Sequence, residues 1–163
     1  MKTIPVATGF TAFVDDEDYE IISAWKWCAR INRGTGPVYA QRTIRVGPRC
    51  LDGHLTFSMH RQILGCKPGD IVDHANGNGL DNRRSNIRIA SASQNASNRR
   101  KSSGTSSQYK GVDWHKASNK WRARIAVEGR TYTLGYSDSQ EELAAMYDEA
   151  ARKLHGEFAR TNA

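Results

Sequence analysis

An Asp-His pair, Asp73-His74, ends a short apolar stretch and precedes a loop rich in glycine and asparagine. Histidine is the side chain whose ordinary pKa, about 6.5, suits a general base at neutral pH. The carboxylate of Asp73 and the amide oxygen of Asn95 are hard ligands of the kind Mg²⁺ takes. Hydrolysis of a phosphodiester needs such a base and cation, because water must be activated and charge on the phosphate neutralised. The alternative is an ordinary turn, which such a pair often forms.

Short elements must position these residues. The pattern predicts a strand at 71–74, a Gly/Asn-rich loop at 75–84, a strand at 86–90 and a polar helix from about Ser91. A unit of this size has almost no core, so we expect its elements to meet around a polar group, which we predict to be a metal ion. Asn86 could hold the His74 loop through its backbone, although alone it is more typical of a cap or turn.

The stretch DHANGNGLDNRRSNIRIASASQN, residues 73–95, resembles the HNH endonucleases, in particular the phage and intron branch whose last motif residue is Asn. The resemblance covers residues 50–99. It implies His74 as general base, Asp73 and Asn95 as ligands of Mg²⁺ (Mn²⁺ being the alternative) and Asn86 as the central structural Asn. His60, in SMHRQILG, matches a position common in this branch. We include it with the catalytic residues and expect a structural or phosphate-contacting role.

The composition limits the classes of protein to which this chain can belong. The chain has 163 residues, 38% of them hydrophobic, and a net charge of +7. Small modules that bind nucleic acid are therefore favoured, and no basic amphipathic helix supports a membrane surface. The cysteines, Cys28, Cys50 and Cys66, form no Cys-x-x-Cys pair, which favours reduced thiols over disulfides or structural zinc. No signal peptide or spanning segment is recognisable, so we expect a cytoplasmic protein of a bacterial or phage-infected cell.

The N-terminal part predicts a β-rich region. We expect a hairpin at 3–14, a helix from Asp15 to about Ala24, strands at 25–32, 38–46 and 54–57, a turn at 33–37 and a helix at 58–64. A two-stranded ribbon carrying arginines fits the DNA major groove. The alternative interpretation of these two strands is a solvated sheet face that carries scattered charges. The pattern DDEDYEIISAWKW…YAQR resembles the leader of many phage HNH nucleases. The ribbon arginines are Arg30, Arg33, Arg42 and Arg45, of which we select Arg30, Arg42 and Arg45 as DNA contacts.

Residues 98–108, NRRKSSGTSSQ, predict a basic flexible linker whose Arg99, Arg100 and Lys101 contact phosphates. Three strands and a helix follow. The strands are expected at 110–115, 120–127 and 130–136, and the helix opens at a capping box, Ser139-x-x-Glu142, and ends near Gly156. The second strand alternates, so one face packs on the helix and the other is basic.

The stretch from YKGVDWHK to ARTN resembles the AP2 DNA-binding domain along its length, through Tyr109-Lys110-Gly111-Val112, Trp121-Arg122-Ala123-Arg124-Ile125 and Leu134-Gly135. In that family the sheet lies in the major groove. Plant members carry Arg or Trp where this chain has Asp113, Thr131 and Thr133, so the target sequence does not carry over. The implied DNA contacts are Lys110, Asp113, His115, Arg122, Arg124, Ala126, Thr131 and Thr133.

We therefore predict an α+β chain: a small antiparallel sheet with a ββα-metal HNH unit in residues 1–97, a linker at 98–108, and a three-stranded antiparallel sheet packed on one helix in 109–163. The predicted activity is metal-dependent hydrolysis of double-stranded DNA, by a nick or double-strand break, at a site that the AP2-like domain recognises. We expect a homing-type enzyme of a phage or mobile intron, acting as a monomer or weak dimer without a small-molecule cofactor. The alternatives are a catalytically silent, sequence-specific DNA-binding regulator and an RNA-binding module, which competition with duplex DNA would distinguish.

Overall fold

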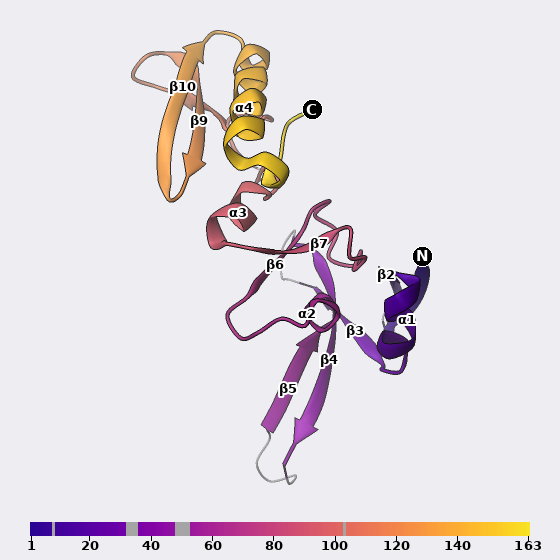
Figure 1. The fold of residues 1–163 in the computed structure, drawn as a ribbon. Helices are drawn as coiled ribbons and strands as arrows, with labels where there is room; N and C mark the ends of the chain where they lie inside the picture. Colours follow the sequence, from indigo (N-terminus) through magenta and orange to yellow (C-terminus); the bar gives the residue numbers. More distant parts are fainter. Residues whose placement is uncertain (8, 32–35, 48–52, 103) are drawn as a thin grey trace. The chain divides into compact units, whose positions relative to one another are not determined.

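The computed structural model in Figure 1 describes residues 1–7, 9–31, 36–47, 53–102 and 104–163. It divides into two compact units, Met1–Ile89 and Ala90–Ala163. Arg33, most of the predicted turn at 33–37, and Cys50 lie outside the described residues. Among the helices of the described ranges, none is both long and apolar enough to cross a membrane.

The first unit contains a five-stranded sheet in the order β2-β1-β3-β4-β5. The predicted N-terminal hairpin forms, and α1 (Asp16–Ser23) then returns the chain to the far side of β1. β3 therefore pairs parallel to β1, because a crossover rather than a tight turn joins them. The other pairs in the sheet are antiparallel. The strands are β1 (Lys2–Ala7), β2 (Phe10–Val14), β3 (Trp27–Ile31), β4 (Val38–Val46) and β5 (Gly53–Ser58).

The core of this unit lies between the sheet, α1, α2 (Met59–Leu64) and the loop after His74. Trp27 is its largest buried side chain, and the indole Nε1 donates to the carbonyl of Ile22 at 2.8 Å. This bond satisfies the polar atom of the indole, as burial of a tryptophan requires. The remaining core residues include Ile4, Val6, Val14, Ala40, Met59, Ile63, Leu80 and Ile87.

The Gly/Asn-rich loop joins β6 (Ile71–His74) to β7 (Ile87–Ala90), which pair as a two-stranded sheet. Backbone bonds attach the loop to β2, since Phe13 donates to the carbonyl of Leu80 and Asn82 donates to that of Phe13, both at 2.8 Å. Gly79 is required here, because a Cβ would lie 2.5 Å from the carbonyl oxygen of Val38. The loop is thus held tightly against the large sheet.

Arg84 fastens the same loop to α1. Its Nε and Nη2 donate to the two carboxylate oxygens of Asp18 at 2.9 and 2.8 Å, and its backbone N–H donates to Asp15. This bidentate pairing neutralises the carboxylate of Asp18, one of the acidic residues at the start of α1. The N-terminal region therefore supports the loop that follows His74.

The second unit contains the expected three-stranded antiparallel sheet packed on one helix, which confirms that part of the prediction. In Figure 1, α4 lies along β9 and β10. Gly111 has a φ of +78°, and a Cβ there would lie 2.1 Å from the ring of Tyr147 on the helix. Glycine thus lets the chain enter the sheet directly over the core. The elements are α3 (Ala92–Ser97), β8 (Val112–His115), β9 (Lys120–Val127), β10 (Arg130–Ser137), α4 (Gln140–His155) and the 3₁₀ turn Gly156–Phe158.

The two helices of this unit are capped differently. Ser139 accepts from the N–H of Glu142 at 3.2 Å, but the carboxylate of Glu142 accepts from Ser137 instead of returning to Ser139. The predicted capping box is therefore only half formed. A complete one stands at α3, where Ser91 and Gln94 bond reciprocally at 3.2 and 2.8 Å. A helix of six residues needs this support.

Part of the predicted linker packs along the edge strand β8. The ammonium group of Lys101 donates to the carbonyl of Val112 at 3.3 Å, and the N–H of Trp114 donates to the hydroxyl of Ser106 at 3.2 Å. Ser107 is buried. These contacts cover backbone groups that an edge strand would otherwise expose.

Candidate active site and DNA-binding surface

Three aromatic rings cluster where β4, α2 and β6 meet. The centroids of His60 and His74 lie 5.1 Å apart, and the ring of Tyr39 lies 5.5 Å from the first and 5.6 Å from the second. Both histidines are buried, with 9% and 5% of their surface exposed. The structure therefore brings together two of the predicted catalytic residues and adds Tyr39, which the sequence did not identify.

Burial keeps both imidazoles neutral. The pKa of His60 is lowered to about 3 by burial and by the neighbouring His74 and Arg61. Burial likewise lowers the pKa of His74, although Asn82 and the carboxylates of Asp73 and Asp81 oppose the shift. A neutral imidazole has a nitrogen lone pair, so His74 can accept a proton at neutral pH.

Asp73, beside His74 on β6, is buried and paired with Arg88 of β7. Nε and Nη2 of Arg88 donate to Oδ2 of Asp73 at 2.9 and 2.8 Å. The charge of the carboxylate is thus balanced within the protein. Sequence reasoning missed Arg88; its alternation with Ile87 on β7 was visible, but its partner on β6 was not.

Asn86 ties the two ends of the loop together. Its Oδ1 accepts from the N–H of Asn76 at 3.0 Å, and its Nδ2 donates to the carbonyl of Asp81 at 2.7 Å. The N–H of Ala75 also donates to the backbone carbonyl of Asn86 at 2.8 Å. These bonds fix the backbone that follows His74, and they limit how far its ring can move.

A cleft of about 500 Å³ opens beside His60 on one face of the β3-β4-β5 sheet. Arg30 pairs with Tyr39, and Gln41 with Ser58, so their side chains share this face. Arg45 continues the same alternation along β4 and is exposed. The face is mostly polar and carries two of the predicted DNA-binding arginines. The cleft is lined by Arg30, Tyr39, Gln41, Thr56, Ser58, His60 and Val72.

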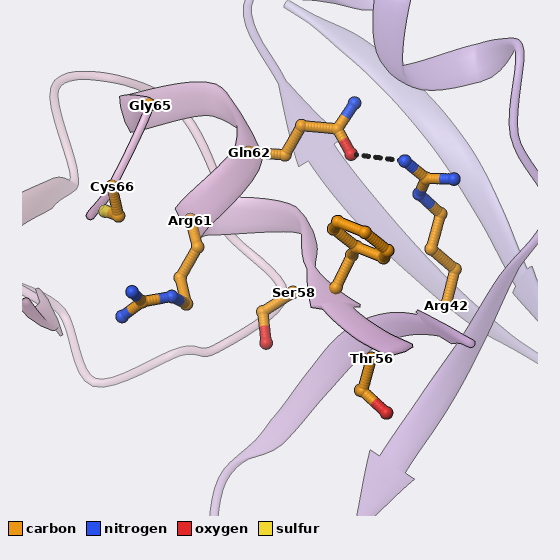
Figure 2. Close-up of a pocket in the computed structure, with 8 residues that line it drawn as sticks. Arg42, Thr56, Ser58, Arg61, Gln62, Gly65 and Cys66 are labelled. Carbon is orange, nitrogen blue, oxygen red and sulfur yellow. Dashed lines mark hydrogen bonds between the residues drawn. The ribbon is translucent and has the colours of Figure 1, made fainter. Parts of the chain in front are cut away.

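Arg42 lies on the opposite face of β4, and Figure 2 shows its bond to Gln62 of α2. Nη2 donates to Oε1 of Gln62 at 3.1 Å, while the guanidinium lies 3.9 Å from the ring centroid of Trp25 and 4.7 Å from that of Phe57. Cation–π stacking of this kind holds an arginine in place. Arg42 therefore links the sheet to the helix that carries His60.

The second unit exposes one face of its sheet. Asp113 of β8 accepts from Arg122 at 2.8 Å and from Arg124 at 2.9 Å, both on β9. On the same face the ring of His115 lies 5.3 Å from that of Tyr136. Thr133 pairs with Arg124, and both predicted threonines of β10, Thr131 and Thr133, are exposed. The predicted contacts of the AP2-like sheet thus share a surface.

The remaining predicted site residues of this unit are not on the strands β8, β9 and β10. Asn95 is partly exposed on α3, and Arg99 and Arg100 after this helix are exposed. Lys110 donates to the carbonyl of Ser97 at the end of α3, and burial, together with the charge of Arg160, lowers its pKa to about 8. Its ammonium group is therefore engaged inside the unit.

A neutral histidine thus lies beside a buried carboxylate, on a strand whose following loop is closed by an asparagine. Residues 61–97 match the family described as HNH endonuclease. An HNH endonuclease of Acanthamoeba polyphaga mimivirus is 34% identical over 156 residues, which is 94% of this chain and 75% of that protein. The chain belongs to the HNH endonuclease family and is a DNA endonuclease of this type.

Two further relatives match different parts of the chain. Protein 3.8 of Escherichia phage T7 is 34% identical over 92 residues, covering 56% of this chain and 75% of that protein. An ethylene-responsive transcription factor of Arabidopsis thaliana is 49% identical over 72 residues, or 41% of this chain and 17% of that protein. AP2-like transcription factors of the same plant and of rice match similarly. The predicted resemblances to HNH and AP2 proteins are confirmed.

Proposed function

We propose that this endonuclease cleaves double-stranded DNA with His74 as general base, at a site that the sheet of the second unit recognises. The observation that carries the proposal is the buried, neutral imidazole of His74 beside Asp73, whose ring contacts those of His60 and Tyr39, two residues that line the cleft together with Arg30. In this reaction Nδ1 or Nε2 of His74 takes a proton from water as the water oxygen bonds to phosphorus and the bond between phosphorus and the leaving 3′ oxygen breaks. Asn86 and Tyr39 restrict the position of the ring.

HNH endonucleases generally use a divalent metal, and the donors of this chain suit one. Asp73 offers a buried carboxylate next to the base, and Asn95 offers an amide oxygen. Hard oxygen donors of this kind suit Mg²⁺, with Mn²⁺ as the alternative. When bound, such an ion stabilises the charge that develops on the phosphate and the departing oxygen. Asp73 would hold it in the first unit; Asn95, the other predicted ligand, belongs to the second unit.

The polar face of the β3-β4-β5 sheet would receive the DNA backbone. Arg30 supplies positive charge in the cleft, and Arg45 extends that charge along the strand. Phosphate contacts of this type position a duplex without reading its sequence. His60, neutral and at the edge of the cleft, would contact the scissile phosphate or support His74. Arg42 has its partners within the protein, so it does not belong to this DNA-binding face.

Recognition is assigned to the exposed face of β8, β9 and β10, with Arg99 and Arg100 contacting phosphates before it. Similarity to AP2-like transcription factors supports this assignment. Relatives in a phage and in a giant virus support a homing-type role in a mobile element. One active centre per chain favours a monomer that nicks one strand, while a weak dimer would cut both.

The test is conversion of supercoiled plasmid carrying phage or host genomic fragments, with Mg²⁺, with Mn²⁺ and with EDTA. Metal-dependent appearance of nicked or linear plasmid supports the proposal, and the ratio of the two products gives the number of strands cut. Substitution of Asn95 by Ala should weaken the response to metal, and binding in EDTA serves as its control. Tight binding without cleavage under any divalent ion would instead favour the catalytically silent regulator.

A further inference from the structure

One carboxylate holds two arginines on the exposed face of the AP2-like sheet. Oδ2 of Asp113 accepts from Nη2 of Arg122 at 2.8 Å, and Oδ1 accepts from Nε of Arg124 at 2.9 Å. Asp113 and Arg122 are paired in the β8–β9 ladder, and Arg124 follows two residues later on the same face. Both oxygens of the carboxylate are therefore used to orient guanidinium groups.

The two arginines are not equivalent. The side chain of Arg122 is 19% exposed, and its buried Nε has no hydrogen-bond partner in the described part of the chain. The side chain of Arg124 is 42% exposed, and Asp113 binds it only through Nε. The two terminal Nη groups of Arg124 are thus not used by Asp113, and together they form a fork of hydrogen-bond donors at the end of the side chain. Arg122 is placed to anchor the carboxylate, while Arg124 is placed to reach a ligand.

We propose that Asp113 is a specificity-determining positioning residue, which Arg122 anchors and which presents the fork of Arg124 to the major-groove edge of a guanine. This inference rests on the proposed function, in which this face lies on duplex DNA. A guanidinium fork matches the O6 and N7 acceptors of guanine. The negative charge of Asp113 also opposes contact with phosphates, so the held arginine favours bases over backbone.

The proposal predicts opposite changes in two affinities. Replacement of Asp113 by Asn removes the anion and loosens both arginines, which are then able to reach phosphates. Binding to unrelated duplexes should become tighter and more dependent on salt. Binding to the preferred duplex should lose its advantage, because a mobile Arg124 no longer selects guanine. A residue with a merely structural role would weaken both affinities together.

The experiment uses the full chain in EDTA, so that no DNA is cut. Wild-type protein first selects duplexes from a random pool. Fluorescence anisotropy then compares the selected duplex, a scrambled one, and the selected duplex with 7-deazaguanine, which lacks N7, at each conserved guanine. For wild type we expect 7-deazaguanine at one position to weaken binding by about tenfold. In Asp113→Asn and in Arg124→Ala this penalty should largely disappear.

The matched control is Asp138→Asn. Asp138 is also in the second unit and carries the same charge, but its partner is Lys120, at 3.7 Å, rather than an arginine of the sheet. This variant should keep the wild-type selectivity. The inference is overturned if Asp113→Asn keeps the guanine penalty, if both variants change alike, or if Asp113→Asn weakens all binding together with a fall in melting temperature. If wild type itself selects no sequence, the proposed recognition fails, and the inference with it.

Discussion

The rings of His60 and His74 meet edge to face, 5.1 Å apart and at 87°. His60 is on α2 and His74 is on β6, and the turn at Lys67–Asp70 connects these two elements. Hydrogen bonds from Arg61 and to Asp70 hold this turn in place. Such close imidazoles disfavour protonation of each other, since two positive charges would share a dry site. This relationship underlies both the chemistry proposed for His74 and the acid sensitivity of the fold.

Stability should fall as the pH falls below neutrality, because His60 is buried neutral. Its folded pKa of about 3 lies below the ordinary value of about 6.5. Because the pKa of His60 is lower in the folded than in the unfolded protein, its contribution to the free energy of unfolding is full at pH values above the unfolded pKa. That contribution is lost as the pH falls toward the folded pKa. Between about pH 7 and pH 4 the loss from His60 is about 3 kcal/mol. Urea unfolding at several pH values should therefore show a smaller loss in His60→Gln than in wild type; equal pH dependence would contradict the assignment.

Arg88→Met should change the response to metal as well as stability. Without metal, removal of the cation that pairs with the buried Asp73 should destabilise the protein by about 3 kcal/mol. Mg²⁺ should raise the melting temperature of the variant more than that of wild type, because it replaces the lost positive charge. Calorimetry with and without Mg²⁺ measures both effects.

Arg83→Met is the control for this prediction. Arg83 pairs with the buried Asp81 at 2.7 Å within the loop that joins β6 to β7, and neither residue is an expected metal ligand. Mg²⁺ should raise the melting temperature of Arg83→Met by no more than it raises that of wild type. An equal Mg²⁺ shift in the Arg88 and Arg83 variants would show that Arg88 has no special relation to a metal at Asp73.

Arg30 and Arg42 should separate DNA contact from internal support. Arg30→Met should weaken DNA binding in EDTA and reduce the salt dependence by about one phosphate contact, with little change in melting temperature. Arg42→Met should lower stability by about 1–2 kcal/mol, since it loses the stacking on Trp25 and Phe57 and the bond to Gln62. Anisotropy titrations at several salt concentrations and thermal unfolding measure the two effects. A loss of affinity in Arg42→Met without a loss of stability would show that Arg42 contacts DNA rather than supporting α2.

Local pattern was enough to predict most elements. Alternation placed strands at 38–46 and 120–127, the bounds that β4 and β9 have. It also separated the two faces of β9, since Ala123 and Ile125 are buried while Arg124 is exposed. The apolar positions of a strand or helix are written in its own sequence, so they require no knowledge of partners.

Contacts between distant segments could not be predicted in this way. Asp73 and Arg88 are on different strands, and Arg42 meets Trp25 and Phe57 only after the sheet has formed. The parallel pairing of β1 with β3 depends on the crossover through α1. Each of these relationships arises from tertiary packing, so the predicted roles of single residues were only as good as the family resemblance that suggested them.

The central claim is that the imidazole of His74 performs the proton transfer, and cleavage by His74→Ala tests it most directly. With Mg²⁺ and saturating protein, the rate of plasmid cleavage should fall by about 10²–10⁴-fold, the usual contribution of a general base. Binding of the same DNA in EDTA should stay close to that of wild type, which shows that the variant folds. A variant that binds normally and cleaves within about tenfold of the wild-type rate would contradict the account, because that loss is smaller than the usual contribution of a general base.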